Sequence, residues 1–190
     1  MVPRKMMLIR HAEKPDEQGK VLGVDESGTP NPNQLSVRGW QRAGALVRFF
    51  SPINEIFVEG IEKPTSIIAC KPANGANSVR SVSTVAPLAA ALGMAVNKDI
   101  GCGDESALIE FLKENSQDAV LICWRHEPIP GIVRALAGNL ENLPSKWPGK
   151  RFDLVWVLEK SESGWSFKQV AQLLLAGDGP AAVVMPLNDA

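Results

Sequence analysis

The sequence is poor in several features that mark particular classes of protein. Its 190 residues include only three cysteines, Cys70, Cys102 and Cys123, and no two of them form a CxxC pair. Their number and spacing predict neither a disulfide framework nor a zinc knuckle. Cys70 and Cys123 lie in or beside apolar runs, where a thiol is typically a small buried hydrophobe. We therefore expect free thiols and a reducing, cytoplasmic location.

Net charge and long apolar runs are also lacking. The formal net charge of −1 argues against nucleic acid or an anionic membrane as the main partner. No segment reaches the length of a membrane helix, and the apolar stretch at residues 6–9 is too short for a signal-peptide core. The composition, with 45% hydrophobic and 22% charged residues, is that of a globular protein, and the length fits a single domain over residues 1–190.

Short apolar runs alternate with amphipathic stretches along the chain. This alternation predicts an α/β three-layer sandwich, in which a mostly parallel central sheet is covered by helices on both faces. The expected strands are residues 6–9, 65–70, 94–96, 119–124, 152–158 and 165–174. The expected helices are residues 37–50, with Ser36 as N-cap, 78–92, 105–113 and a stretch from Pro128 and Pro130 to about residue 136.

The remaining segments are rich in proline, glycine and polar residues. Residues 14–34 form a long polar loop, and loops of this length in compact domains are often functional. Residues 71–77 and 97–104 are further loops, and 159–164 is a polar connection between the last two strands. The tail from Ala176 is expected to be loosely ordered.

The chain contains two histidines, and both occupy the same local context. His11 and His126 each follow an arginine, and each comes directly after an apolar strand. Ligands bind outside the carboxyl ends of strands in sheets of this kind, so the two histidines are expected to share one site. A neutral imidazole can attack phosphorus, while guanidinium groups neutralise the phosphate oxygens by charge-assisted hydrogen bonds. The pair therefore indicates phosphoryl transfer.

Four ordered segments resemble the histidine phosphatase (phosphoglycerate mutase-like) superfamily. Residues 10–13, Arg-His-Ala-Glu, are similar to its Arg-His-Gly or Arg-His-Ala signature. Residues 35–43 are similar to its Leu-Thr-x-x-Gly-x-x-Gln-Ala helix start, and residues 80–88 resemble the segment that carries its second phosphate arginine. His126, followed by an Ile-Pro step and a helix, matches the place of the second catalytic histidine.

The resemblance implies a role for each matching residue. His11 would be the nucleophile, and Arg10, Arg80 and His126 would bind the phosphoryl oxygens. A protonated His126 would stabilise the charge that develops in the transition state. The reaction would need no metal or organic cofactor, because the arginines supply the positive charge. A zinc deaminase is excluded because its Pro-Cys-x-x-Cys motif is absent.

The sequence departs from the family pattern in the approach to Arg80 and at the second histidine. Pro72 precedes Arg80 by eight residues where the family has three, so residues 73–77 must loop out. Arg125 stands where glycine usually precedes the second histidine. It is expected either to join the phosphate pocket or to point away into a salt bridge.

A leaving alkoxide needs a proton, for which a carboxylic acid is the usual donor. Glu127 resembles the acid of the acid-phosphatase branch, whereas Asp104 and Glu105 occupy a position more like the acid of the mutase branch; a site with no dedicated acid is the third possibility. Glu13 and Lys14 either contact substrate or form a surface ion pair.

The prediction is a phosphatase acting on a phosphorylated small molecule or phosphoprotein. The alternatives are a catalytically weak or inactive phosphate-site fold used for binding, and a phosphomutase.

Overall fold

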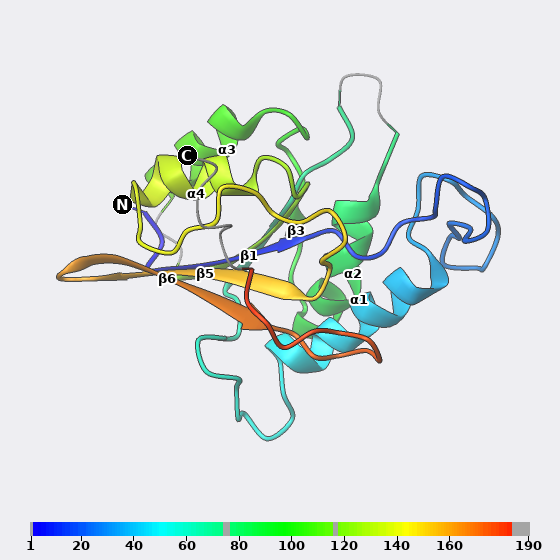
Figure 1. Ribbon diagram of the computed structural model, residues 1–190, viewed down its shortest axis with the longest axis horizontal. Coiled ribbons are helices and arrows are strands. Elements are labelled where there is room, and N and C mark those ends of the chain that lie inside the picture. Colours follow the sequence, from blue (N-terminus) through cyan, green and yellow to red (C-terminus); the bar gives the residue numbers. More distant parts are fainter. Residues whose placement is uncertain (1, 74–76, 116–117, 184–190) are drawn as a thin grey trace.

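The computed structural model describes residues 2–73, 77–115 and 118–183 as an α/β arrangement around one sheet (Figure 1). The elements in chain order are β1 (Lys5–Arg10), α1 (Val37–Phe50), β2 (Ser66–Ala69), α2 (Arg80–Leu92), β3 (Val96–Asn97), α3 (Glu105–Glu114), β4 (Ala119–Trp124), α4 (Ile129–Ala137), β5 (Leu154–Ser161) and β6 (Gly164–Ala171). The predicted fold class is confirmed.

The sheet has the strand order β3-β2-β4-β1-β5-β6 and is mostly parallel. Strand β4 is parallel to both β1 and β2, and β2 is parallel to β3, whereas β5 pairs antiparallel with β1 and β6. The central strands β1 and β4 are buried along their whole length, as expected for near-continuous apolar runs in a sheet covered on both faces. Because they are parallel neighbours, the two Arg-His pairs leave the sheet at the same edge.

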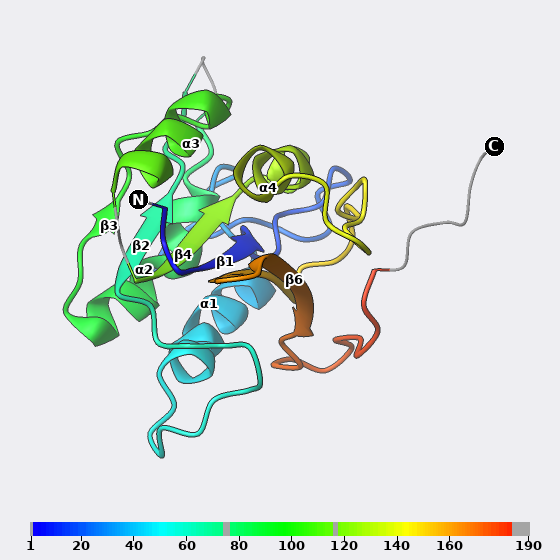
Figure 2. The ribbon, with the colours of Figure 1, turned by 90° about the vertical axis from the view of Figure 1, so that its left-hand side faces the viewer.

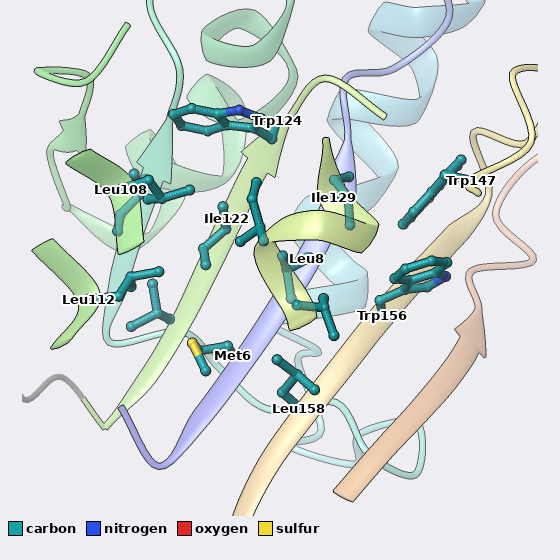
Figure 3. Packing of buried hydrophobic residues seen from close by; sticks show 14 of the residues in the cluster. Met6, Leu8, Leu108, Leu112, Ile122, Trp124, Ile129, Trp147, Trp156 and Leu158 are labelled. Carbon is teal, nitrogen blue, oxygen red and sulfur yellow. The ribbon is translucent and has the colours of Figure 1, made fainter. Parts of the chain in front are cut away.

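Helices cover both faces of the sheet (Figure 2). Successive side chains of a strand point to opposite faces, so β1 divides its apolar residues between two cores. Met6 and Leu8 pack with residues of α3 and α4, and Figure 3 shows this core, including Trp124 and Trp156. Met7 and Ile9 pack instead against residues of α1 and α2. Burial on both sides fixes the register of the strand that presents His11.

Two helices begin at side-chain caps. Ser36 accepts a hydrogen bond from the backbone N–H of Gly39 and so caps α1 as predicted, while Asp104 caps α3 by accepting from Ala107. A side chain at position 39 would collide with the carbonyl oxygen of Glu13, which would lie 2.3 Å from its Cβ. Glycine there allows the first turn of α1 to pack against the chain just after His11.

Several boundaries differ from the sequence-based expectation. Helix α2 begins at Arg80, two residues later than predicted, and β3 is displaced to residues 96–97. The predicted polar connection at 159–164 is wrong, because β5 continues to Ser161 and pairs with β6 across a two-residue turn. Of the segment predicted to loop out before α2, residues 74–76 lie outside the described residues. In the part of the chain that is described, no helix is long and apolar enough to cross a membrane.

The prediction of three free thiols is wrong. Cys70, at the end of β2, forms a disulfide with Cys102 in the loop before α3, and Cys123 is a buried thiol. The two partners are 32 residues apart in sequence, so their spacing gave no local signal. Disulfides are rare in cytosolic proteins, so the cysteines no longer support a reducing compartment.

The segment beyond Ala176 is anchored rather than loose as far as Val183. Asp178 is only 3% exposed and forms an ion pair of 2.7 Å with Arg42 of α1. Arg151 donates hydrogen bonds to the carbonyls of Gly179 and Ala181. Residues 184–190 of the predicted loose tail lie outside the described residues.

Candidate active site

A cleft of about 390 Å³ opens at the carboxyl ends of β1 and β4. The backbone N–H of His11 donates to the carbonyl of Trp124, which holds the two strand ends together where the Arg-His pairs begin. All five residues predicted for the site line this cleft. Its lining is Arg10, His11, Lys14, Pro72, Ala73, Ser78, Arg80, Ser81, Cys102, Gly103, Arg125, His126 and Glu127.

His11 is held in one tautomer. Its Nδ1 lies 2.7 Å from the carbonyl oxygen of Ala12, and because a carbonyl only accepts, Nδ1 carries the proton. The lone pair therefore remains on Nε2. The pKa of His11 is lowered to about 3, mainly by burial and also by Arg10, Arg80 and His126, against the opposing effect of the Ala12 hydrogen bond. The imidazole is neutral, and hence able to act as a nucleophile, across the physiological pH range.

Arg10 is 2% exposed, and contacts with Gly149 and Phe152 hold its side chain in place. Its Nη1 donates to the carbonyl of Gly149 at 2.6 Å, and its guanidinium carbon lies 3.9 Å from the centre of the Phe152 ring. Burial lowers the pKa of Arg10 to about 10, so the guanidinium keeps its charge at neutral pH. A buried cation of this kind is a preorganised partner for an anion.

Arg80 reaches the cleft from the start of α2, and two backbone carbonyls orient its side chain. Its Nε donates to Gln34 and its Nη2 to Pro32, both in the loop that precedes α1. Thr84 joins this arginine to the nucleophile, because its hydroxyl donates to the Arg80 carbonyl and accepts from the N–H of Ala12. The arginine and the residue after His11 are thus fixed relative to each other despite their separation in sequence.

His126 stands opposite, just beyond β4. Burial and the charge of Arg10 lower its pKa, which favours the neutral imidazole in the free protein. Its Nδ1 is buried and has no hydrogen-bond partner among the described residues, although Glu127 Oε2 lies 3.3 Å away without the alignment of a hydrogen bond. Arg10 Nε is likewise buried and unpartnered. Buried polar atoms without partners are rare in proteins, and two of them at one cleft indicate a functional site.

The three candidate carboxylates have different surroundings. Asp104 is engaged as the cap of α3, and Glu105 accepts hydrogen bonds from Trp124 Nε1 and the N–H of Gly103. Glu127 alone of the three lines the cleft. Burial acts to raise the pKa of Glu127, but its own backbone N–H, His126 and Arg125 lower it overall.

Arg125 does not point away from the cleft, and its ion pair is formed with a residue that also lines the cleft. It lines the cleft, and its Nε lies 3.6 Å from Glu127 Oε2. Sequence reasoning did not single out Gly149, Phe152 or Thr84, which carry no local motif and reach the site only through the fold. Gly149 lies close to His126, since a Cβ at this position would come within 3.4 Å of its Nε2.

Glu13 points away from the cleft into a buried ionic network. Arg42, 2% exposed, lies 2.8 Å from Glu13 Oε1 and 2.7 Å from Asp178 Oδ1. Arg38 adds a further contact to Glu13 at 3.1 Å. Of the two readings left open for Glu13, the structure favours the ion pair, in a buried form. The network fixes the segment two residues beyond His11 to α1 and to the chain near Asp178.

The described residues contain no group of three or more histidine, cysteine, aspartate or glutamate side chains that could hold a metal ion. Among the described residues, the ionisable groups that line the cleft are guanidinium, ammonium and imidazole groups, together with the single carboxylate of Glu127. Such a set suits an anion with several oxygens. This set of groups places a neutral imidazole beside cations that can neutralise the negative charge of a tetrahedral phosphoryl group.

No protein-family model matches the sequence, and no curated protein matches it. Solved structures do match. The mycobacterial glucosyl-3-phosphoglycerate phosphatase superposes with a TM-score of 0.55 at 12% identity, covering 88% of this chain and 97% of that chain. The alpha-ribazole phosphatase of Shigella flexneri gives a TM-score of 0.53 at 12% identity, covering 86% and 94%.

A phosphoserine phosphatase mutant of Entamoeba histolytica, in complex with phosphoserine, gives a TM-score of 0.50 at 11% identity, covering 86% of this chain and 94% of that chain. These proteins belong to the histidine phosphatase superfamily. This chain has their fold, and the predicted phosphoglycerate mutase-like architecture is confirmed. The activities named are those of the matched proteins.

Proposed function

We propose that this protein is a phosphatase that hydrolyses a phosphate monoester, or a phosphoramidate, through a phosphohistidine formed on His11. One observation carries the proposal: two imidazoles and three guanidiniums from distant parts of the chain line one cleft at the sheet edge. The depressed pKa of His11 and its fixed tautomer support the nucleophilic role. The fold shared with known phosphatases supports the same reaction class.

The first step transfers the phosphoryl group to the protein. The Nε2 lone pair attacks phosphorus, the new N–P bond forms, and the ester P–O bond breaks. Arg10 and Arg80 neutralise the phosphoryl oxygens, and His126 donates to one of them. Glu127 supplies the proton that the leaving oxygen takes. Although its pKa is lowered in the free protein, a bound phosphate dianion raises it again by like-charge repulsion.

The second step regenerates the histidine. Glu127, now a carboxylate, takes a proton from a water molecule whose oxygen attacks phosphorus on the side opposite to Nε2. The N–P bond breaks and inorganic phosphate leaves. Throughout, the Nδ1 proton remains donated to the Ala12 carbonyl, which stabilises the imidazolium character of the phosphorylated ring. The arginines supply the positive charge, so the proposed mechanism uses no metal ion.

The proposal is tested with p-nitrophenyl phosphate at mildly acidic pH in the presence of a chelator. We expect the protein to turn over this ester and His11→Ala to lose at least a thousandfold in rate. The matched control is Arg48→Ala, which removes an exposed cation of α1 outside the cleft and is expected to leave the rate within twofold. Turnover that the chelator abolishes would overturn the metal-free mechanism.

A quenched reaction distinguishes the nucleophile. The trapped phosphoprotein is expected to be labile in acid, stable in alkali and absent from His11→Ala, as is characteristic of phosphohistidine. An acid-stable adduct would identify a different nucleophile. Binding of inorganic phosphate or vanadate without turnover of any ester would instead identify a binding module built on a phosphatase fold.

A further inference from the structure

The loop between β1 and α1 lines a second cavity beside the cleft. Its volume is about 380 Å³, within the range of pockets that take small organic ligands. The walls come almost entirely from this loop, with one contribution from α2. They are Lys14, Pro15, Asp16, Glu17, Gly19, Val21, Leu22, Gly23, Pro30, Asn31, Pro32 and Arg80.

This second cavity adjoins the cleft, because Lys14 and Arg80 line both. Arg80 is held at the boundary by its hydrogen bonds to Gln34 and Pro32, which are part of the same loop. A ligand anchored by Arg80 in the cleft therefore lies next to the second cavity, and the part of it beyond the phosphoryl group can extend past Lys14.

The walls of the second cavity are largely apolar. Val21 and Leu22 are 45% and 55% exposed, unusually open for large aliphatic side chains, and three prolines complete the apolar surface. The cations at the cavity are the two shared with the cleft, and the lining carboxylates Asp16 and Glu17 offset their charge, with Glu17 4.0 Å from the Lys14 ammonium group. These carboxylates disfavour a second phosphate or another strongly anionic group. The surface suits an uncharged, apolar group.

Hydrogen bonds within the loop and to α1 hold it in a defined conformation. The N–H of Asn31 donates to Gly23, that of Val24 donates to Leu35, and the indole of Trp40 donates to the Val24 carbonyl. Gly23 permits the closest approach, since a Cβ there would lie 2.3 Å from the Asn31 oxygen. A cavity with walls fixed in this way binds with little ordering cost.

We propose that the second cavity binds the alcohol part of the substrate, and that the substrate is a small-molecule phosphate monoester with an apolar, uncharged alcohol. The inference rests on the proposed phosphatase function and narrows its substrate class. The limited volume of about 380 Å³ favours such a molecule over a phosphorylated protein segment. Binding of the alcohol group places the phosphoryl group against His11 and raises kcat/KM.

The experiment compares phenyl phosphate with 2-naphthyl phosphate, whose leaving groups have similar acidity but differ by one ring. Burial of the extra ring is expected to raise kcat/KM by roughly tenfold. In Leu22→Asn this preference should fall to about threefold or less, because a polar group replaces part of the apolar wall. A matched control is Leu173→Asn, at a leucine that is 58% exposed and outside both cavities, which should keep the tenfold preference.

The outcomes separate this inference from the function on which it rests. If turnover depends on His11 but kcat/KM is equal for both esters, the proposed alcohol subsite is refuted and the phosphatase function stands. The same conclusion follows if the preference for 2-naphthyl phosphate survives Leu22→Asn combined with Val21→Thr. A phosphoserine peptide that is a better substrate than 2-naphthyl phosphate also overturns the subsite. Absence of turnover for every ester refutes the phosphatase itself.

Discussion

Removal of the Cys70–Cys102 disulfide is predicted to lower the stability of the folded chain. The bond closes a loop with a sequence separation of 32 residues. Loop-closure entropy for that length corresponds to roughly 3.7 kcal/mol at 25 °C. For a chain of 190 residues this converts to a decrease in Tm of roughly 9 °C. The loss is sizeable against the roughly 5–15 kcal/mol that stabilises a typical domain.

Cys102→Ser is the variant of choice. Cys70 is fully buried, with its sulfur 3.5 Å from the Ser81 hydroxyl, whereas Cys102 is partly exposed at the rim of the cleft. Changing Cys102 therefore removes the crosslink with little disturbance of the core. Urea unfolding at equilibrium, with and without a thiol-free reductant, measures the effect.

The reductant provides an internal control. It should destabilise the parent protein by the same amount as the substitution, and it should leave Cys102→Ser unchanged, since Cys123 is a thiol in both. Equal stability of parent and variant would contradict the reasoning. So would a reductant effect that persists in Cys102→Ser.

Three further predictions concern the site and its support. Because the pKa of His11 is lowered to about 3, its ring should not protonate between pH 8 and pH 4 in an NMR titration. The unfolded chain takes up this proton near pH 6.5. His11 therefore contributes to a loss of stability as the pH falls from 6.5 towards 3. Glu127→Gln should slow esters with poor leaving groups more than activated aryl esters, and equal slowing would remove Glu127 from the acid role. Arg42→Ala should lower the free energy of unfolding by about 3 kcal/mol, because it leaves the largely buried carboxylates of Glu13 and Asp178 with only the partly exposed Arg38 as a cationic partner, whereas Arg48→Ala should change it little.

The sequence was most informative where one local rule decides the structure. The apolar run at 119–124 became the buried strand β4 without any change of boundary, and Ser36 capped α1 as its side chain predicts. The convergence of His11 and His126 also followed from a general rule, because parallel neighbours end at the same edge of a sheet. These features depend on periodicity and on fold class, both of which can be read from a single chain.

The errors arose where distant contacts overrule local composition. Glu159 looks like a turn residue, yet it lies in β5 and its carboxylate is 3.3 Å from the Lys5 ammonium group, so a polar side chain occupies a strand. The chain near Asp178 looks loose, yet the buried charge of Arg42 holds it. The support of Arg10 by Gly149, across 139 residues, likewise has no sequence signature.

A net charge of −1 hides a strongly cationic site, and the ionic network explains how the two coexist. Glu13 is two residues from His11, and a free carboxylate there would oppose the binding of a phosphate dianion. Arg42 draws that carboxylate into its own ion pair with Asp178, so Glu13 does not line the cleft. Lys14, Arg80 and Arg125 face the cleft with Glu127 as the one carboxylate among them. The local charge of the cleft is therefore set by which side chains the fold turns into it. Arg42 affects this charge by pairing with Glu13, although Arg42 does not line the cleft.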